Sequence, residues 1–210
     1  RAGALAHSDG VQALGHVPVS FPASGLDALS LSAHKVGGPV GIGALVVRRG
    51  VRLAPIGHGG GQEARLRSGT VPVALASGFA AAAADAVAEL ASEAPRLAAL
   101  RGRVADAMQG LGRVNEAPAV SPAIVNVTFA GCRADDLLLL LDAAGIDCST
   151  GSACTAGVHR PSEVLLAMGR TEAEASASVR FSFGPDTDEA AVVALLGALP
   201  DAVARARAAF

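Results

Sequence analysis

The stretch Ser32-Ala-His-Lys-Val-Gly-Gly-Pro-Val-Gly-Ile-Gly43 contains Lys35, the only lysine among the seventeen basic residues of the chain, the other sixteen being arginine. Arginine stays protonated, whereas a desolvated lysine can lose its proton and form a Schiff base with a carbonyl compound. The apolar runs at 29–32 and 44–47, on either side of the glycines, each predict a strand. A lysine between them would stand at a strand end, where α/β sheets bind ligands. The alternative is an ordinary surface lysine.

The composition limits the possible functions. The chain has 210 residues, 51% hydrophobic and 17% charged, which predicts one or two globular domains. A net charge of −2, with no Trp or Tyr, argues against nucleic-acid binding. The uncharged run 68–84 is too short and too weakly apolar for a bilayer, so we expect no membrane span. Three irregularly spaced cysteines favour a reducing compartment, and we expect a cytoplasmic protein.

The first half of the chain predicts short strands followed by helices. Short strands are expected at 4–7 and 16–21, with a turn at 22–25. Pro95 predicts a break between an alanine-rich helix at about 72–92 and an amphipathic helix. The apolar stripe of the second helix is Leu97, Leu100, Val104, Met108 and Leu111. We therefore place a domain boundary here, giving domains 1–92 and 93–210.

The second half predicts an α+β arrangement around a lone cation. Strands are expected at 124–129, 146–149 and 178–183; helices are expected at 134–144 and 161–168, and a last helix is expected after a Thr187 cap. Within 178–183 apolar and polar residues alternate, and Arg180 is the one charge on the polar face. Arg180 can clamp a substrate carboxylate through two hydrogen bonds, or it can form an ordinary salt bridge.

Polar residues around Lys35 suggest a cofactor site. A carboxylate at a strand end, such as Asp9, can pair with a protonated ring nitrogen, and Gln12 can hydrogen-bond a phenolic oxygen. Taken alone, this motif is better explained as an Asx turn. Ser32 and His34 flank Lys35 and can donate to a phosphate, although for His34 alone a structural hydrogen bond is the favoured interpretation.

Cys154 is the candidate nucleophile. It lies in Cys148-Ser-Thr-Gly-Ser-Ala-Cys154-Thr-Ala-Gly157, where small residues on both sides leave a thiol exposed. Cys148, and less clearly Cys132, fit buried and unreactive thiols. With His159 the two nearby cysteines make a poor zinc pattern, so we expect no metal.

Five motifs occur in the order seen in one known family. They are His7-Ser-Asp-Gly-Val-Gln12, Ser32-Ala-His-Lys35, Gly59-Gly-Gly-Gln-Glu63 with Leu66-Arg-Ser-Gly-Thr70, Ser149-Thr-Gly-Ser-Ala-Cys154, and Val179-Arg-Phe-Ser182. The chain resembles the latter half of cysteine desulfurases, pyridoxal-phosphate enzymes of the class V aminotransferase group. The cysteine motif is similar to the branch with the longer, mobile cysteine loop, which serves iron–sulfur assembly and tRNA thiolation. The implied fold class is α/β: residues 1–92 end the large domain of a fold-type-I pyridoxal-phosphate transferase, and 93–210 form its small α+β domain.

The resemblance implies a cofactor role for each residue of the first site. Lys35 holds pyridoxal 5′-phosphate through a Schiff base and later shuttles the Cα proton of the substrate. Asp9 pairs with the ring nitrogen, and Gln12 bonds the ring oxygen O3′. Ser32 and His34 hold the phosphate.

The remaining roles concern the substrate and the partners. In a homodimer, Thr70 reaches the phosphate of the cofactor in the partner subunit. Arg180 grips the carboxylate of L-cysteine. Cys154 attacks the substrate sulfur, which leaves alanine and a persulfide for a sulfur-acceptor protein.

The chain departs from the family in ways that leave alternatives open. Gly10-Val11 replaces the usual small residues, and Ala33 stands where glycine is common. The first half of the family, with its ring-stacking histidine, an asparagine near O3′ and further phosphate ligands, has no counterpart here. We therefore expect the chain alone to bind cofactor poorly and to turn over little. The alternatives are a selenocysteine or cysteine lyase of the same group, and a non-catalytic scaffold that docks a sulfur acceptor.

Overall fold

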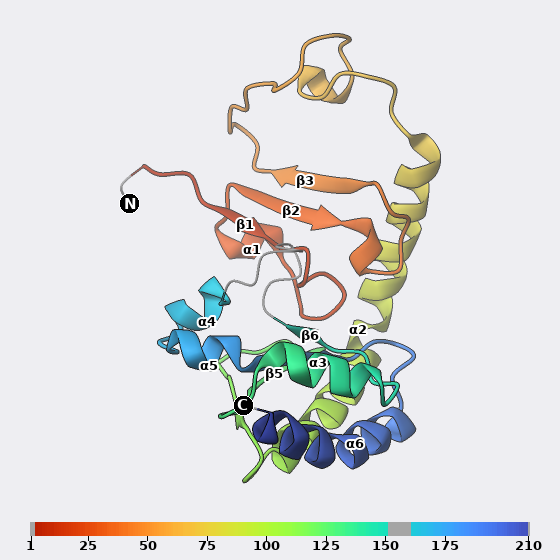
Figure 1. Cartoon of the computed structure of the whole chain (residues 1–210). Coiled ribbons are helices and arrows are strands. Elements are labelled where there is room, and N and C mark those ends of the chain that lie inside the picture. The colour runs from red at the N-terminus through yellow and green to blue at the C-terminus, as the bar shows by residue number, and fades with distance from the viewer. Residues whose placement is uncertain (1–2, 151–160, 210) are drawn as a thin grey trace. The chain divides into compact units, whose positions relative to one another are not determined.

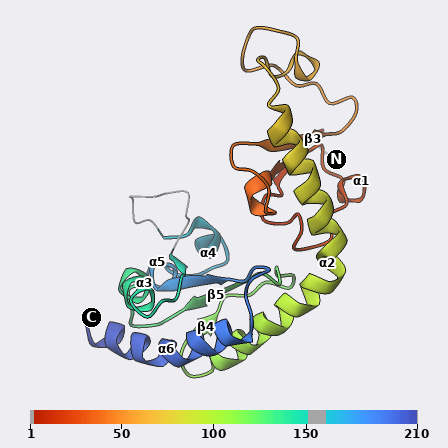
Figure 2. The same cartoon turned by 90° about the vertical axis from the view of Figure 1, so that its right-hand side faces the viewer.

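The computed structural model describes residues 3–150 and 161–209 (Figure 1). The chain divides into two compact units, Arg1–Ala91 and Ser92–Phe210. Helix α2 (Val73–Ala107) belongs to both units (Figure 2), and the division falls inside it. The boundary predicted from the sequence, after residue 92, lies one residue later. Each unit contains one β-sheet of its own.

The sheet of the first unit has three strands in the order β1-β2-β3. These are β1 (His7–Asp9), β2 (Ala28–Ser32) and β3 (Gly43–Val47). β1 and β2 are parallel, with Asp9 opposite Ser30, and β3 runs antiparallel to β2. The strands expected at 29–32 and 44–47 are therefore confirmed.

Two predictions for the segments around β1 are wrong. The strand expected at 4–7 starts only at His7, because the Ala6 N–H donates to the carboxylate of Asp27 at 2.8 Å before the ladder begins. The segment 16–20 ends a turn and continues as irregular backbone into a short helix, α1 (Phe21–Ser24). Pro18 lacks the N–H that a strand would need, and Gly25 ends α1 at a φ of 72°.

Helix α2 runs unbroken through Pro95, contrary to the predicted break. A proline inside a helix removes one hydrogen bond, and the residues around it must offset that loss. The next residue, Arg96, pairs with Glu93 at 2.8 Å and donates to the carbonyl of Gly184 at 3.1 Å. The predicted apolar stripe is confirmed, since four of its members are buried and Leu111 packs against the core.

Among the described residues, α2 is the one helix that is long and apolar enough to cross a membrane by length and composition. A single helix of this kind is weak evidence, because core helices of soluble proteins have the same length and composition. The expectation that the chain has no membrane span stays a prediction.

The sheet of the second unit has four strands in the order β4-β5-β7-β6, and all neighbours are antiparallel. They are β4 (Arg113–Val114), β5 (Ile124–Thr128), β6 (Ser149–Thr150) and β7 (Ser178–Ser182). The strands predicted at 124–129 and 178–183 are confirmed. The one predicted at 146–149 begins only at Ser149. The two-residue strand β4 is too short to give a pattern and was not predicted.

Helices α2, α3 (Ala134–Asp142) and α6 (Glu189–Ala208) share one hydrophobic core with β5 and β7. The cap of α6 is Asp188, whose carboxylate accepts from the Ala191 N–H at 2.8 Å, and not Thr187 as predicted. The Thr187 hydroxyl accepts from the Gly184 N–H at 2.9 Å instead, which closes the turn before the helix.

Two short helices lie between residue 161 and β7. They are α4 (Glu163–Ala167), which falls within the predicted 161–168, and α5 (Glu172–Ser176), which was not predicted. Thr171 and Glu174 form a capping box at the start of α5. This pairing is visible in the sequence as Thr-x-x-Glu and is the signal that would have found the helix.

Candidate active site

The first group of candidate residues lies at one edge of the sheet in the first unit. Asp9 ends β1, and Ser32 ends the neighbouring strand β2 (Figure 1). A single-turn 3-10 helix, Ala33–Lys35, follows directly. Because β1 and β2 are parallel, their carboxyl ends meet at the same edge. The structure thus brings Asp9 and the Ser32–Lys35 turn to one edge, and Lys35 follows a strand end as the sequence predicted.

The glycine-rich run folds back on Ala33 and so fixes the turn that carries Lys35. Ala33 is fully buried, and its carbonyl accepts from the N–H groups of Val36 at 3.0 Å and Gly38 at 2.9 Å. A Cβ on Gly38 would lie 3.0 Å from that carbonyl oxygen, and one on Gly43 would lie 2.6 Å from the Leu31 carbonyl oxygen. Glycine is therefore required for this close return of the backbone.

Asp9 forms the Asx turn expected for its motif, and one carboxylate oxygen is left over. Its Oδ1 accepts from the Val11 N–H at 2.9 Å, and the side chain is exposed. A Cβ on Gly10 would lie 2.7 Å from Cδ1 of Leu29, so the chain crosses β2 closely just after Asp9. Gln12 follows on this turn and is also exposed. Because the Asx turn uses only Oδ1, the Oδ2 atom of Asp9 can contact a ligand at the same time.

Ser32 and His34 are joined by a hydrogen bond. The Ser32 hydroxyl lies 2.8 Å from Nδ1 of His34, which is the structural hydrogen bond expected for this histidine. When the hydroxyl donates to Nδ1, the other ring nitrogen, Nε2, carries the proton. That N–H is then a donor on an exposed side chain, next to Lys35.

Lys35 is exposed, and its amine makes no hydrogen bond or ion pair with the described residues. The described residues therefore do not supply the desolvation by which a lysine loses its proton. What they supply is an accessible primary amine at a sheet edge shared with a carboxylate.

Thr70 lies in the long loop between β3 and α2 and is exposed. The Arg67 guanidinium donates to its carbonyl at 3.2 Å. Just before, Glu63–Arg65 take φ values of 49°, 55° and 68°, each of which costs about 1–2 kcal/mol in a residue other than glycine. The proposed contact of Thr70 with a partner subunit stays a prediction.

Arg180 lies in the middle strand pair of the second unit, on the face away from the core. Val179, Phe181 and Phe183 are buried in the core, which confirms the predicted alternation. Nη2 of Arg180 lies 3.4 Å from the Ser149 hydroxyl, and its buried Nε has no hydrogen-bond partner. Among the described residues no carboxylate pairs with Arg180, so the ordinary salt bridge is not found there. This half-buried cation fits a role in binding an external anion.

The cysteines divide into two described thiols and one outside the described residues. Cys154 lies outside them. Burial raises the pKa of the Cys132 thiol, whose Sγ faces the Val203 carbonyl at 3.8 Å. Burial, with Asp147 and Asp142 nearby, raises the pKa of Cys148 to about 11. Both thiols are therefore poor nucleophiles at neutral pH.

Within residues 3–150 and 161–209, no group of three or more metal-binding side chains is found.

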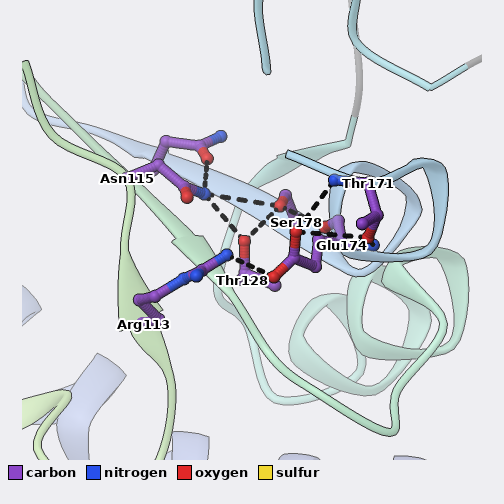
Figure 3. Close-up of polar contacts among 7 residues, drawn as sticks. Arg113, Asn115, Thr128, Thr171, Glu174 and Ser178 are labelled. Atoms are coloured by element: carbon purple, nitrogen blue, oxygen red, sulfur yellow. Dashed lines mark hydrogen bonds and ion pairs between the residues drawn. The ribbon is translucent and has the colours of Figure 1, made fainter. Parts of the chain in front are cut away.

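Sequence reasoning missed two polar features. Asp27 is buried beside Arg48 and forms an ion pair with it. A hydrogen-bonded network also joins Asn115, Thr128 and Ser178 on the polar face of the second sheet (Figure 3). The signal for the network was the alternation of polar residues in strand 124–128, in phase with Arg180 across the sheet.

The comparison with protein families gives a match over residues 1–195 to the aminotransferase class-V family. The chain belongs to this family.

The relatives of this class V aminotransferase include cysteine desulfurases, the subgroup expected from the motifs. The chain is 50% identical to an IscS-like cysteine desulfurase of Mycobacterium tuberculosis over 96% of this chain and 52% of the relative. The structure of a NifS-like protein superposes with a TM-score of 0.85 at 33% identity, over 96% of this chain and 53% of that one. A structure titled SspA in complex with cysteine matches at 35% identity and a TM-score of 0.66, over 85% and 50% of the two chains. The resemblance and the fold class are confirmed, and the chain spans about half the length of these relatives.

Class V aminotransferases use pyridoxal phosphate, and the residues at the sheet edge of this chain fit that cofactor. The carboxylate of Asp9 suits a protonated ring nitrogen, and the bonded Ser32–His34 pair suits a phosphate. The exposed amine of Lys35 suits an aldehyde.

Proposed function

We propose that the chain is part of a pyridoxal-phosphate-dependent cysteine desulfurase that converts L-cysteine to L-alanine and places the sulfur on Cys154. The observation that carries the proposal is the meeting of Asp9 and the Ser32–Lys35 turn at one edge of parallel strands. Two further observations support it: Arg180 has no carboxylate partner among the described residues, and the relatives are named cysteine desulfurases.

The residues of this chain bind the cofactor and move one proton. Bound pyridoxal phosphate supplies an electron sink that acidifies the Cα–H bond of an amino acid. The Asp9 carboxylate keeps the proton on the ring nitrogen. Ser32 and His34 hold the phosphate, and the Lys35 amine, once free, accepts the Cα proton and returns it.

The residues of the second unit bind and cleave the substrate. The Arg180 guanidinium donates two hydrogen bonds to the carboxylate of cysteine, which orients the side chain. The Cys154 thiolate attacks the substrate sulfur and forms an S–S bond. The C–S bond of the substrate breaks, and its electron pair stays with the carbon that becomes the methyl group of alanine. The product on the protein is a persulfide, which passes to a sulfur-acceptor protein for iron–sulfur cluster assembly or tRNA thiolation.

The setting proposed for this chemistry is a cytoplasmic homodimer. A thiolate nucleophile needs a compartment that keeps thiols reduced. In the dimer, Thr70 of one protomer would bind the cofactor phosphate of the other. Light scattering and cell fractionation test these two parts of the proposal.

The experiment is spectroscopic and uses the full-length protein with pyridoxal phosphate. The protein should show a visible absorbance band, which Lys35→Ala should abolish. Lys35→Arg is the matched control, because it keeps the charge and also loses the band. L-Cysteine should yield equal amounts of alanine and persulfide, and Cys154→Ala should reduce this reaction more than a hundredfold.

Two results would contradict the proposal. A full-length protein without the band would favour the non-catalytic scaffold. Undiminished release of sulfur from cysteine by Cys154→Ala would exclude the persulfide route and favour the lyase, which acts on selenocysteine without a nucleophilic thiol.

A further inference from the structure

One row of side chains crosses the polar face of the second sheet through Arg180. Asn126 of β5 is the direct cross-strand neighbour of Arg180 in β7, and Ser149 of β6 is the neighbour on the other side. Asn115, just after β4, continues the row through its N–H, which donates to the Asn126 carbonyl at 2.8 Å. Directly opposed residues have Cβ atoms about 5 Å apart, so the Asn126 side chain lies beside the guanidinium stem.

The hydrogen-bond network behind Asn126 has only one possible proton direction (Figure 3). It ends at the backbone carbonyl of Glu174, which can only accept, so the Ser178 hydroxyl donates to it at 2.7 Å. A hydroxyl has one proton, so the 2.8 Å contact between Thr128 and Ser178 uses the proton of Thr128. Thr128 must therefore accept at its other contact, from Nδ2 of Asn115 at 2.8 Å.

This direction fixes the amide of Asn126. The group of Asn115 that faces Thr128 is the NH2 group, and the same nitrogen lies 2.7 Å from the side chain of Asn126. Its partner there must accept, so it is Oδ1 of Asn126. The NH2 group of Asn126 is left as a donor, and it makes no hydrogen bond with the described residues.

We infer that Asn126 is a second donor for the carboxylate that Arg180 binds, and that it determines specificity for a carboxylate over a neutral amide. The inference rests on the proposed function, because that function makes the ligand of Arg180 an amino acid. A carboxylate accepts from both the guanidinium and the Asn126 NH2, whereas a carboxamide turns its own NH2 toward one of these donors. The buried, unpaired Nε of Arg180 fits a site where an acceptor completes the hydrogen bonding.

The test uses Asn126→Asp in the full-length holoenzyme. Aspartate keeps an oxygen that accepts from Asn115, so the network is retained, and it replaces the NH2 donor with a negatively charged oxygen. Calorimetry measures the affinities for L-alanine and L-alaninamide, neither of which carries sulfur, so the readout is independent of turnover. The preference for L-alanine should fall by at least about ten- to a hundredfold, because the variant loses a hydrogen bond to a charged group and adds a like charge beside it.

Two further variants make the test specific. Ser182→Ala changes an exposed residue on the same face of β7 and should leave the preference unchanged. Asn126→Ser is neutral and too short to reach the ligand, so it should lower the preference about tenfold even if the aspartate variant folds poorly. The ratio of two ligands on one variant cancels a general loss of folded protein.

The outcomes separate this inference from the proposed function. A preference that stays unchanged in both Asn126 variants overturns the inference alone. A holoenzyme with no preference for L-alanine over L-alaninamide overturns both the inference and the assigned role of Arg180. A preference that depends on Asn126, in a protein that does not desulfurate cysteine, supports the inference and rejects the reaction.

Discussion

The arginines of this chain differ in whether a neighbouring carboxylate pairs with their guanidinium group. Arg180 has no carboxylate partner among the described residues, whereas Arg48 pairs with buried Asp27 and Arg113 pairs with Glu174. Arginines without such partners are the ones available to a ligand, and this distinction is invisible in the sequence. The surroundings also set the reactivity of the two described thiols, because burial raises the pKa of Cys132 and of Cys148.

Thiol reactivity is the residue-level prediction. In Cys154→Ala, iodoacetamide should label Cys148 roughly a hundredfold more slowly than free cysteine at pH 8. A pKa of about 11 leaves only about one thiolate in a thousand at that pH. The thiolate fraction, and with it the rate, should rise as the pH approaches 11, and Cys132 should behave in the same direction because its pKa is also raised. Peptide mapping by mass spectrometry measures both sites, and labelling of native Cys148 at the rate of free cysteine would contradict the burial argument.

Elements in this chain follow local patterns where one face is buried and depart from them where packing compensates. The apolar stripe of α2 and the alternation in β7 each faces the core as predicted. The segment at 16–21 alternates like a strand, yet it forms a turn, irregular backbone and the start of α1 instead. Pro95 should break a helix, but α2 continues, and Arg96, the next residue, donates hydrogen bonds to the loop at 184–187.

The two faces of α3 give the element-level prediction. Leu137 is fully buried in the core, while Leu139, two residues along, is 67% exposed. Leu137→Ala should lower the free energy of unfolding by about 2–5 kcal/mol, because it leaves a cavity. Leu139→Ala, the matched control, should change it by less than about 0.5 kcal/mol. Urea denaturation followed by circular dichroism measures both, and equal losses would mean that α3 does not bury the face described.

The two units differ in how many hydrophobic side chains they bury. Among the described residues, the buried hydrophobic side chains of the first unit are Leu29, Ala33 and Phe79. The continuous core lies wholly in the second unit, between Leu97 and Ala206. Burial of apolar surface is the main favourable term in folding, so the two units should differ in stability.

Separate expression of the two units gives the whole-molecule prediction. A fragment of residues 92–210 should fold by itself and unfold cooperatively, because it contains the continuous core. A fragment of residues 1–91 should not, because three buried hydrophobic residues cannot offset the chain entropy of its ordering. Circular dichroism and the dispersion of amide NMR signals distinguish the two states. A cooperatively folded 1–91 fragment would show that its sheet needs no further cover.

The sequence alone determined the order of the motifs, the strands on either side of Lys35, the buried stripe of α2 and the alternation around Arg180. These features are local, because side-chain chemistry and periodicity within a few residues define them. Only the tertiary structure decided that Asp9 and the Lys35 turn share a sheet edge, that α2 continues through Pro95, and that Asn126 stands opposite Arg180 with its NH2 group left over. Strand register and hydrogen-bond direction depend on residues far apart in the chain, and no local pattern specifies which of them will meet.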